Sequence, residues 1–223
     1  MPALASILAE TRTRVAHLEG KGAELAKRAR QAHPGPSFLP KLTATVAVIA
    51  EVKRRSPSQG TIRADLDAVR CARSYEQGGA AAISVLTEER HFGGSLGDLQ
   101  RVAAAVSVPV LRKDFIIHEA QIHEARIAGA SAVLLIARIL EASQLRDLAD
   151  AIRESRMTPL IEVHDAGELD AALSAQPGVL GVNARDLDTL TMNPGRAEEI
   201  MRQVPANVTL VAESGVQSRA DVE

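Results

Sequence analysis

The chain has 223 residues, of which 46% are hydrophobic and only 2% aromatic, and its formal net charge is −2. This hydrophobic fraction supports a globular core and argues against a disordered or fibrous protein. The scarcity of aromatic rings argues against stacking platforms for single-stranded nucleic acid, and the near-neutral charge gives no general attraction to nucleic acid or to an anionic membrane. Any anion must therefore be bound by a local group of cationic side chains.

The only cysteine, Cys71, lies in a stretch predicted to be helical, where it cannot form an internal disulfide. A lone thiol is typical of a reducing cytosol, and we expect it to be a small buried helix residue. The first residues lack the basic start and apolar centre of a signal peptide, and no apolar run approaches the roughly 18 residues that span a bilayer. We therefore expect a cytoplasmic protein that binds neither nucleic acid nor membrane.

Residues from about 3 to 30 show the periodicity of a helix. Apolar side chains recur at spacings of three, four and seven residues, and they are Leu4, Ile7, Leu8, Val15 and Leu18. Gly20 and Gly22 predict a break before a second helical piece over residues 23–32, and residues 33–37 (HPGPS) predict a loop.

Seven short apolar runs follow, and each ends in polar or charged residues. They span residues 45–53, 81–88, 108–115, 131–137, 158–164, 179–186 and 208–214. Amphipathic stretches rich in helix formers separate them, so that the strand starts recur every 20 to 35 residues or so, the length of a βα unit. Near-continuous apolar strands favour a parallel sheet that is covered on both faces.

The even distribution of polar residues at the strand ends favours a barrel over a doubly wound sheet. In a barrel all strand ends converge on one mouth, whereas a doubly wound sheet needs such residues only beside its switch point. We predict an α/β protein, a (β/α)8 TIM barrel forming one domain over residues 1–223, with residues 1–44 as an N-terminal helical extension. Since seven strands do not close an eight-stranded barrel, we expect strand eight and its helix to be missing from this chain.

The strand ends carry the residues that could perform chemistry. Glu51 and Lys53 alternate onto one face of the first strand, and Lys113 points inward at the end of the third. An inward lysine at a barrel mouth can act as a general acid or form a Schiff base. Glu162, which shares a face with His164, is a candidate base or partner of a lysine.

The last two strands add polar groups. Asn183 and Arg185 are candidate neutral and cationic grips on a substrate, and Glu213, Ser214 and Gly215 end the seventh strand with a glycine that permits close approach of an anion. His118 and His123 are five residues apart and do not match a zinc helix, so we expect no metal. Together these residues suit an anionic, phosphosugar-like substrate that undergoes acid–base chemistry.

Seven motifs, in this order, resemble the indole-3-glycerol phosphate synthase family of tryptophan biosynthesis. They are IAEVKRRSPSQG, ISVLTEERHFGGS, PVLRKDFI, AVLLIARIL, IEVHD, GVNARDL and AESGV. The resemblance covers nearly the whole chain and implies a (β/α)8 barrel whose bottom is capped by the N-terminal extension. It also implies that 1-(2-carboxyphenylamino)-1-deoxyribulose 5-phosphate is converted to indole-3-glycerol phosphate, with loss of CO2 and water and without cofactor or metal.

The resemblance assigns roles to individual residues. It implies that Lys113 protonates the ketone oxygen, that Glu162 is the acid–base group of the dehydration, and that Lys53 grips the substrate carboxylate, while Glu51 and Asn183 orient these groups. Positions that match substrate-binding residues of the family are Ser56, Phe115, Leu134, Arg185, Glu213 and Ser214. Ser56 and Gly215 match the phosphate site, to which the family adds a Gly-rich loop after strand eight.

Two alternatives stay open at this point. Another phosphate-binding barrel, such as phosphoribosylanthranilate isomerase, would need a cysteine and an aspartate as its acid–base pair, and Cys71 lies on a predicted helix. A truncated and inactive barrel fragment would persist only by association with another chain. For the synthase we expect a small phosphosugar-anthranilate substrate and a monomer or weak homo-oligomer.

Overall fold

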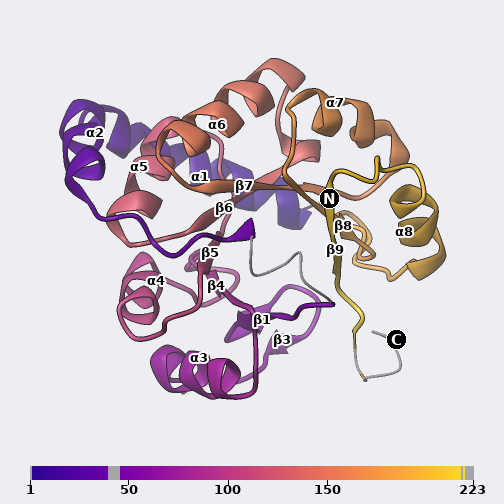
Figure 1. Ribbon diagram of the computed structural model, residues 1–223, viewed down its shortest axis with the longest axis horizontal. Helices are drawn as coiled ribbons and strands as arrows, with labels where there is room; N and C mark the ends of the chain where they lie inside the picture. Colours follow the sequence, from indigo (N-terminus) through magenta and orange to yellow (C-terminus); the bar gives the residue numbers. More distant parts are fainter. Residues whose placement is uncertain (1, 40–45, 217, 219–223) are drawn as a thin grey trace.

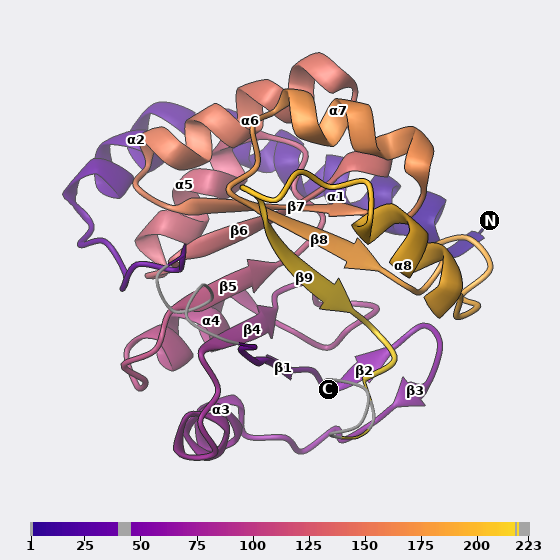
Figure 2. The ribbon, with the colours of Figure 1, turned by 45° about the vertical axis from the view of Figure 1, so that its right-hand side comes forward.

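The computed structural model describes residues 2–39, 46–216 and 218. Its centre is a parallel sheet whose seven strands pair with one another in chain order. They are β1 (Ile49–Val52), β4 (Ala82–Leu86), β5 (Val110–Lys113), β6 (Ala132–Ile136), β7 (Thr158–Val163), β8 (Val179–Asn183) and β9 (Thr209–Glu213). The sheet curls, and the helices that follow the strands lie on its outer side (Figures 1 and 2).

Each apolar run that the sequence predicted to be a strand contains one strand of this sheet. The order of pairing confirms the α/β fold with a curled parallel sheet. The first run was predicted to begin at residue 45, which lies outside the described residues. Within the described part of the chain β1 and β9 are the end strands of the sheet, and the absence of an eighth strand stays a prediction.

Helices follow the strands, as expected for repeated βα units. They are α3 (Ala68–Gln77), α4 (Leu96–Ala103), α5 (Glu119–Ile127), α6 (Ala142–Glu154), α7 (Leu169–Ser174) and α8 (Pro194–Met201), with short 3-10 helices η2 (Ala137–Ile139) and η3 (Ala166–Glu168). Four of these helices begin after a capping residue whose side chain accepts a backbone N–H of the first turn. Such a cap satisfies a donor that would otherwise be unpaired. The capping residues are Asp67, Ser95, His118 and Asn193.

Alternation along each strand produces two separate cores. Inward-facing side chains fill the inside of the curled sheet together with Phe38, and they include Leu111, Leu134, Leu160 and Val179. Outward-facing side chains pack beneath the helices and include Val133, Leu135, Ile161, Leu180 and Val182. Full burial of one such side chain contributes roughly 1.5 to 3 kcal/mol, so both cores stabilise the strands that carry the polar mouth.

The N-terminal extension forms α1 (Pro2–Glu19) and α2 (Gly22–Gln31), and the break lies where the glycines predicted it. Buried Ile7, Thr11 and Val15 are spaced by four and form one face of α1. The Arg14 Nη2 atom lies 3.0 Å from Asp114 Oδ1, which directly follows β5. The expectation that the extension caps the barrel bottom is therefore wrong for α1, which lies at the carboxyl ends of the strands.

The segment after α2 does cover the opposite end of the sheet. Phe38 is 1% exposed and packs in the inner core with Ala82 and Ala132, the first residues of β4 and β6. The Arg126 guanidinium on α5 donates to the Ala32 carbonyl at 2.8 Å and ties this segment to the outer helices. The extension thus contacts both ends of the sheet, with a helix at one end and an aromatic plug at the other.

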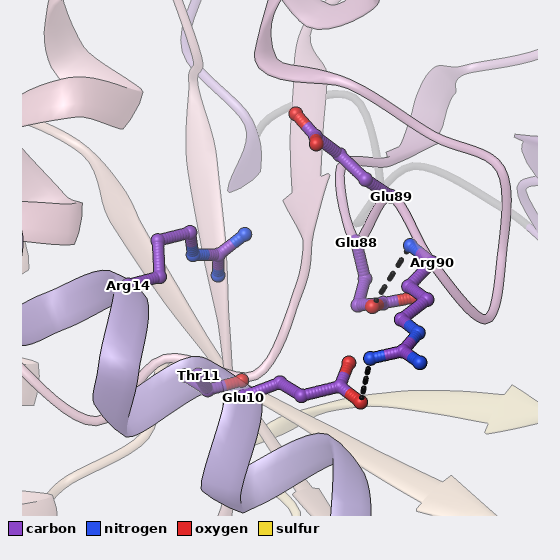
Figure 3. Close-up of a pocket in the computed structure, with 6 residues that line it drawn as sticks. All are labelled: Glu10, Thr11, Arg14, Glu88, Glu89 and Arg90. Atoms are coloured by element: carbon purple, nitrogen blue, oxygen red, sulfur yellow. Dashed lines mark hydrogen bonds and ion pairs between the residues drawn. The ribbon is translucent and has the colours of Figure 1, made fainter.

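A small cleft of about 150 Å³ separates α1 from the loop after β4 (Figure 3). Glu10 on α1 accepts from Arg90 at 2.8 Å and contacts His91 Nε2 at 3.3 Å. Glu88 accepts backbone N–H groups of Arg90, His91 and Phe92. Although one ligand atom from each of Glu10, Glu88 and His91 lies within 4.8 Å of the others, these atoms already have protein partners. We interpret the group as a clamp between α1 and the loop.

Asp114 lies beneath α1 in a buried network that faces away from the inner core. Its side chain is 0% exposed and accepts from Thr87 Oγ1 at 2.6 Å and from Arg112 Nη2 at 3.1 Å. Burial alone would raise the pKa of Asp114, but the guanidinium groups of Arg112 and Arg14 lower it below its usual value. The carboxylate is therefore ionised at neutral pH and holds two cations, the fully buried guanidinium of Arg112 and the partly exposed one of Arg14.

None of the helices in the described residues is long and apolar enough to cross a membrane. The hydrophobic stretches of the chain are instead the short strands and the buried faces of amphipathic helices.

The Asp114→Asn variant should lower the free energy of unfolding by about 3 to 5 kcal/mol, because it removes the closer carboxylate of the buried Arg112 and leaves only Glu124, at 3.4 Å. Urea unfolding followed by circular dichroism measures the change. Because folding lowers the pKa of Asp114, its contribution is present at neutral pH and is lost as the pH falls below about 4. The control Asp150→Asn removes an exposed carboxylate on α6 and should change stability by no more than about 0.5 kcal/mol. Equal effects of the two variants would contradict the assignment.

Candidate functional site

Five charged side chains from four strands meet at the carboxyl end of the sheet. The Lys113 Nζ atom lies 2.6 Å from Glu213 Oε2, 3.5 Å from Glu162 Oε2 and 3.8 Å from Glu51 Oε2. Lys53 completes the group through an ion pair with Glu51. We call these residues, Glu51, Lys53, Lys113, Glu162 and Glu213, the lysine–carboxylate cluster. All five were predicted from the sequence, and the structure brings them together.

Register and alternation explain why these side chains converge. Glu51 continues the inward face of β1 above Ile49, and Glu162 continues that of β7 above Leu160, both of which belong to the inner core. Each charged group therefore lies one step beyond an apolar residue that fills the inside of the sheet. The apolar layer below keeps water from the cluster on that side.

Gly181 on β8 makes room for one carboxylate of the cluster. A Cβ atom at this position would overlap Glu213 Oε1 and would lie 2.9 Å from Leu160 Cδ2. Gly181 pairs with Glu162 in the register of β7 and β8. The missing side chain therefore lets Glu213 reach across β8 toward Lys113 and Glu162.

The carboxylates determine the charge of Lys113, whose side chain is 22% exposed. Burial alone would lower the pKa of Lys113, but the charges of Glu213, Glu162 and Glu51 raise it well above the usual value. The sequence left open which of these effects is larger, and the structure shows that the carboxylates prevail. Lys113 is therefore an ammonium at neutral pH.

The three carboxyl groups of the cluster differ in acidity. Burial would raise the pKa of both Glu51 and Glu162, but Lys113 lowers the two values, helped by Lys53 at Glu51 and by His164 at Glu162. For Glu213, burial and the negative charge of Glu162 raise the pKa to about 8 against the opposing effect of Lys113. Two carboxylates are thus ionised near neutral pH, and the third can carry a proton, so that the cluster contains both acids and bases.

Asn183 and Ser214 lie side by side at the ends of β8 and β9. The Ser214 hydroxyl donates to Asn183 Oδ1 at 2.8 Å, and the Arg185 backbone N–H donates to the same oxygen at 3.0 Å. The Arg185 guanidinium instead donates to the carbonyl of Leu190 in its own loop. Strand β8 ends at Asn183, so alternation no longer determines where the Arg185 side chain points.

The remaining predicted residues occupy different surroundings. Phe115 and Leu134 belong to the inner core, and the Phe115 ring centroid lies 6.2 Å from that of Phe92. Ser56 lies in a hairpin of β2 (Arg55–Ser56) and β3 (Gly60–Thr61), where its hydroxyl accepts from the Gln59 N–H at 3.2 Å. Gly215 has φ +83°, a conformation that favours glycine, in the turn after β9.

Three further residues, to which the sequence assigned no role or only the ordering of a loop, contact the cluster or the inner core beneath it. His164 is 0% exposed, and its Nε2 atom lies 3.1 Å from Glu162 Oε1. Ser84, which pairs with Glu51 in the register of β1 and β4, has a buried hydroxyl. Phe92 lies in the loop after β4, against Phe115. Alternation placed His164 on the face of Glu162, so this residue could have been found as a partner.

Two discounted signals have structural roles. His118 caps α5 by accepting the Ala120 N–H at 3.1 Å, and His123 lies 3.4 Å from the exposed Glu119 carboxylate. Cys71 is half-buried on α3 and packs against the outer core. A cysteine on the outer side of the sheet does not fit the acid–base role that the isomerase alternative requires.

Comparison with known proteins gives consistent results. A family model described as indole-3-glycerol phosphate synthase matches residues 4–223. The chain is 48% identical over 222 residues to the indole-3-glycerol phosphate synthase of Mycolicibacterium gilvum, which covers 98% of this chain and 82% of the relative. It is 48% identical over 200 residues to indole-3-glycerol phosphate synthase 1 of Streptomyces coelicolor, covering 89% of this chain and 74% of that protein. For the protein of Mycolicibacterium vanbaalenii the identity is 53% over 177 residues, 79% of this chain and 65% of the relative.

Similar solved structures have far lower sequence identity. The N-acetylmannosamine-6-phosphate 2-epimerase of Clostridium perfringens has a TM-score of 0.60 and 14% identity, over 85% of this chain and 84% of that one. The 2-keto-3-deoxy-6-phosphogluconate aldolase of Zymomonas mobilis has a TM-score of 0.53 and 14% identity, over 88% of this chain and 77% of that one. At such identities the likeness shows the fold alone.

The pKa of Glu213 predicts that stability falls as the pH rises. Folding raises this pKa from 4.5 to about 8, so the folded state retains a proton that the unfolded state releases between these values. The contribution of Glu213 is thus full below about pH 4.5 and is lost as the pH rises through 8. The Glu213→Gln variant should therefore gain stability relative to the wild-type protein between about pH 5 and pH 9, as urea unfolding would measure. The exposed Glu198→Gln control should parallel the wild type. A difference between Glu213→Gln and wild type that is independent of pH would refute the raised pKa.

Proposed function

Because this chain belongs to the indole-3-glycerol phosphate synthase family, we propose that it converts 1-(2-carboxyphenylamino)-1-deoxyribulose 5-phosphate to indole-3-glycerol phosphate. The reaction releases CO2 and water and is that of a carbon–carbon lyase of tryptophan biosynthesis. The observation that carries the proposal is the ammonium of Lys113 among three acidic side chains, above an apolar layer at the carboxyl end of a curled parallel sheet.

Lys113 supplies the proton for ring closure. The ring carbon that bears the carboxylate attacks the ketone carbon, and the Lys113 ammonium protonates the ketone oxygen as the new carbon–carbon bond forms. Loss of CO2 then returns the electron pair to the ring and restores its aromaticity. A well-placed general acid of this kind accelerates a reaction by about 10² to 10⁴-fold.

The carboxylates manage the protons of the dehydration. The hydroxyl group made from the ketone leaves as water. Its departure needs an acid that protonates the hydroxyl oxygen and a base that removes a proton from a neighbouring atom of the new ring. Glu162, with its lowered pKa, is ionised and suits the base. Lys53 donates the proton to the departing hydroxyl, and Glu51 and Asn183 orient the lysines and the substrate.

The walls of the site suit a substrate with an aromatic ring and two anionic groups. Phe115 and Leu134 provide the apolar surface for the ring, and Lys53 pairs with the ring carboxylate in place of Glu51. Ser56 in the β2–β3 hairpin and Gly215 after β9 hold the phosphate through their backbone and hydroxyl groups. Arg185, Glu213 and Ser214 complete the set of substrate-binding residues.

We further propose that the fold is a (β/α)8 barrel in which an eighth strand belongs between β9 and β1. Both strands lie at the ends of the described sheet, and Leu210 on the outer face of β9 is 39% exposed. A barrel of this kind would make residues 1–223 part of a single domain with residues 1–44 as its extension. The protein works in the cytoplasm as a monomer or weak homo-oligomer, on a small phosphosugar-anthranilate substrate, without a cofactor or metal.

Fluorescence of the indole product after addition of the substrate tests the function directly. The Lys113→Ala variant should lose about 10² to 10⁴-fold in kcat, because no other ammonium replaces the acid at the ketone. Lys113→Arg keeps a positive charge among the carboxylates but donates a proton poorly, and it should also be inactive while folded. The exposed Lys27→Ala control on α2 should be fully active. A folded wild-type protein that makes no indole product would rule out the synthase activity, and near-normal turnover in Lys113→Ala would refute the role of this lysine.

The Lys53→Ala variant should affect binding as well as rate. A hydrogen bond to a charged group contributes about 1.5 to 3 kcal/mol, so the loss of the grip on the carboxylate should raise KM by about 10 to 100-fold. The kcat should fall too, because Lys53 also donates the later proton. Steady-state kinetics with the same assay separates these effects, and an unchanged KM would count against carboxylate binding by Lys53.

A further inference from the structure

A buried histidine lies behind the cluster, between two carboxylates. The His164 side chain is 0% exposed. Its Nε2 atom lies 3.1 Å from Glu162 Oε1, and its Nδ1 atom lies 3.6 Å from Glu168 Oε2. Glu162 uses its other oxygen toward Lys113, at 3.5 Å. The Glu162 carboxylate is therefore held between an imidazole on one side and an ammonium on the other.

The chemistry of imidazole decides the charge of this ring. A neutral imidazole has one nitrogen that donates and one that accepts, whereas both nitrogens of the cation donate. Both ring nitrogens of His164 lie at ion-pair distance from carboxylate oxygens, and neither has a hydrogen-bond partner among the described residues, so a neutral ring would leave the lone pair of one buried nitrogen close to a negative charge. The imidazolium form suits both neighbours electrostatically, and its charge offsets that of Glu162, which is itself buried.

Glu168 is fixed in turn by its own partners. Its Oε2 atom accepts the His164 backbone N–H at 2.7 Å, and its Oε1 atom accepts from Arg138 Nε at 2.6 Å. Arg138, on η2 after β6, also binds Asp165 at 2.5 Å and Asp188 at 3.4 Å. The loops after β6, β7 and β8 are therefore joined through one guanidinium, which holds the carboxylate behind the histidine.

We propose that His164 is a positioning residue for the synthase reaction, whose imidazolium holds the Glu162 carboxylate beside Lys113 and keeps it ionised. Arg138 and Glu168 keep the ring in place. The kinetic part of this inference rests on the proposed function, whereas the charge of the ring does not. His164 acts through Glu162, because the ring itself is completely buried and does not face the mouth.

The acidities are consistent with this arrangement. Burial alone would lower the pKa of His164, but Glu162 from β7 and Glu168 from η3 raise it to about 9. The other charged groups nearby, Lys113 and Glu213, contact Glu162. The imidazolium in turn adds to the effect of Lys113 in lowering the pKa of Glu162.

Nuclear magnetic resonance of the wild-type protein tests the charge directly. In ¹⁵N spectra of the histidine side chains, His164 should have both nitrogens protonated at neutral pH and should titrate near pH 9. His123, whose pKa is lowered by burial, is the internal comparison and should titrate below 6.5. The signal of His164 is identified by its loss in His164→Gln or by its shift in Glu168→Gln. A neutral His164 ring at pH 7 would overturn the proposal.

The pH dependence of kcat tests the effect on Glu162. The His164→Gln variant keeps a donor but loses the positive charge, so the pKa of Glu162 should rise. A base must be ionised to act, so the acidic limb of the kcat profile should move to higher pH by about one unit, with a KM within about threefold of wild type. A merely structural role would lower activity without moving this limb. His123→Gln is the matched control and should retain the wild-type profile.

The two proposals fail in different ways. If the wild-type protein makes no indole product, the synthase function fails, and the spectra still decide the charge of His164. If it makes the product but the ring is neutral, or the limb does not move in His164→Gln, the positioning role fails. If His164→Gln does not fold, Glu168→Gln takes its place. We then expect the acidic limb of the kcat profile to move to higher pH by a smaller amount, and an unmoved limb would contradict the proposal.

Discussion

The structure of the mouth depends on one requirement, which is that a lysine ammonium at the end of β5 must have enough negative charge around it to remain protonated. Three acidic side chains from three other strands meet this requirement, with Glu51 and Glu162 ionised, and Lys113 between them offsets the repulsion of their charges. The apolar layer beneath strengthens both effects because it excludes water. Strand register, the gap at Gly181 and the cations behind the carboxylates all serve this balance of charge.

Balanced charge also explains how one site can serve successive steps. A lysine ammonium, an ionised carboxylate and a carboxyl group with a raised pKa lie within a few ångströms of one another, so in the proposed reaction a proton given up in one step could be replaced from the next group. The second row of ion pairs, from His164 through Glu168 to Arg138, ties this chemistry to the loops of three neighbouring βα units. The positions of the charges are thus determined by the sheet as a whole.

Much of this arrangement follows from the sequence. Alternation fixes which side of a strand a residue faces, and parallel strands bring their carboxyl ends together, so Glu51, Lys113 and Glu162 could be predicted to meet. Arg185 shows where the reasoning stops, because its strand ends at Asn183 and its guanidinium turns to the loop. The position of α1 could not be predicted either. An apolar stripe shows that a helix buries one face, but the partner depends on ion pairs with residues far along the chain.

Those distant partners have a consequence for how the protein is made. Arg14 and Asp114 are 100 positions apart, and Glu10 and Arg90 are 80 apart. At about 5 to 20 residues per second, a ribosome adds Asp114 roughly 5 to 20 s after Arg14. During that interval the end of β5, which α1 contacts through Arg14, does not yet exist. The helix α1 can therefore make these contacts only after the carboxyl ends of β4 and β5 have been synthesised, and its apolar stripe is exposed until then.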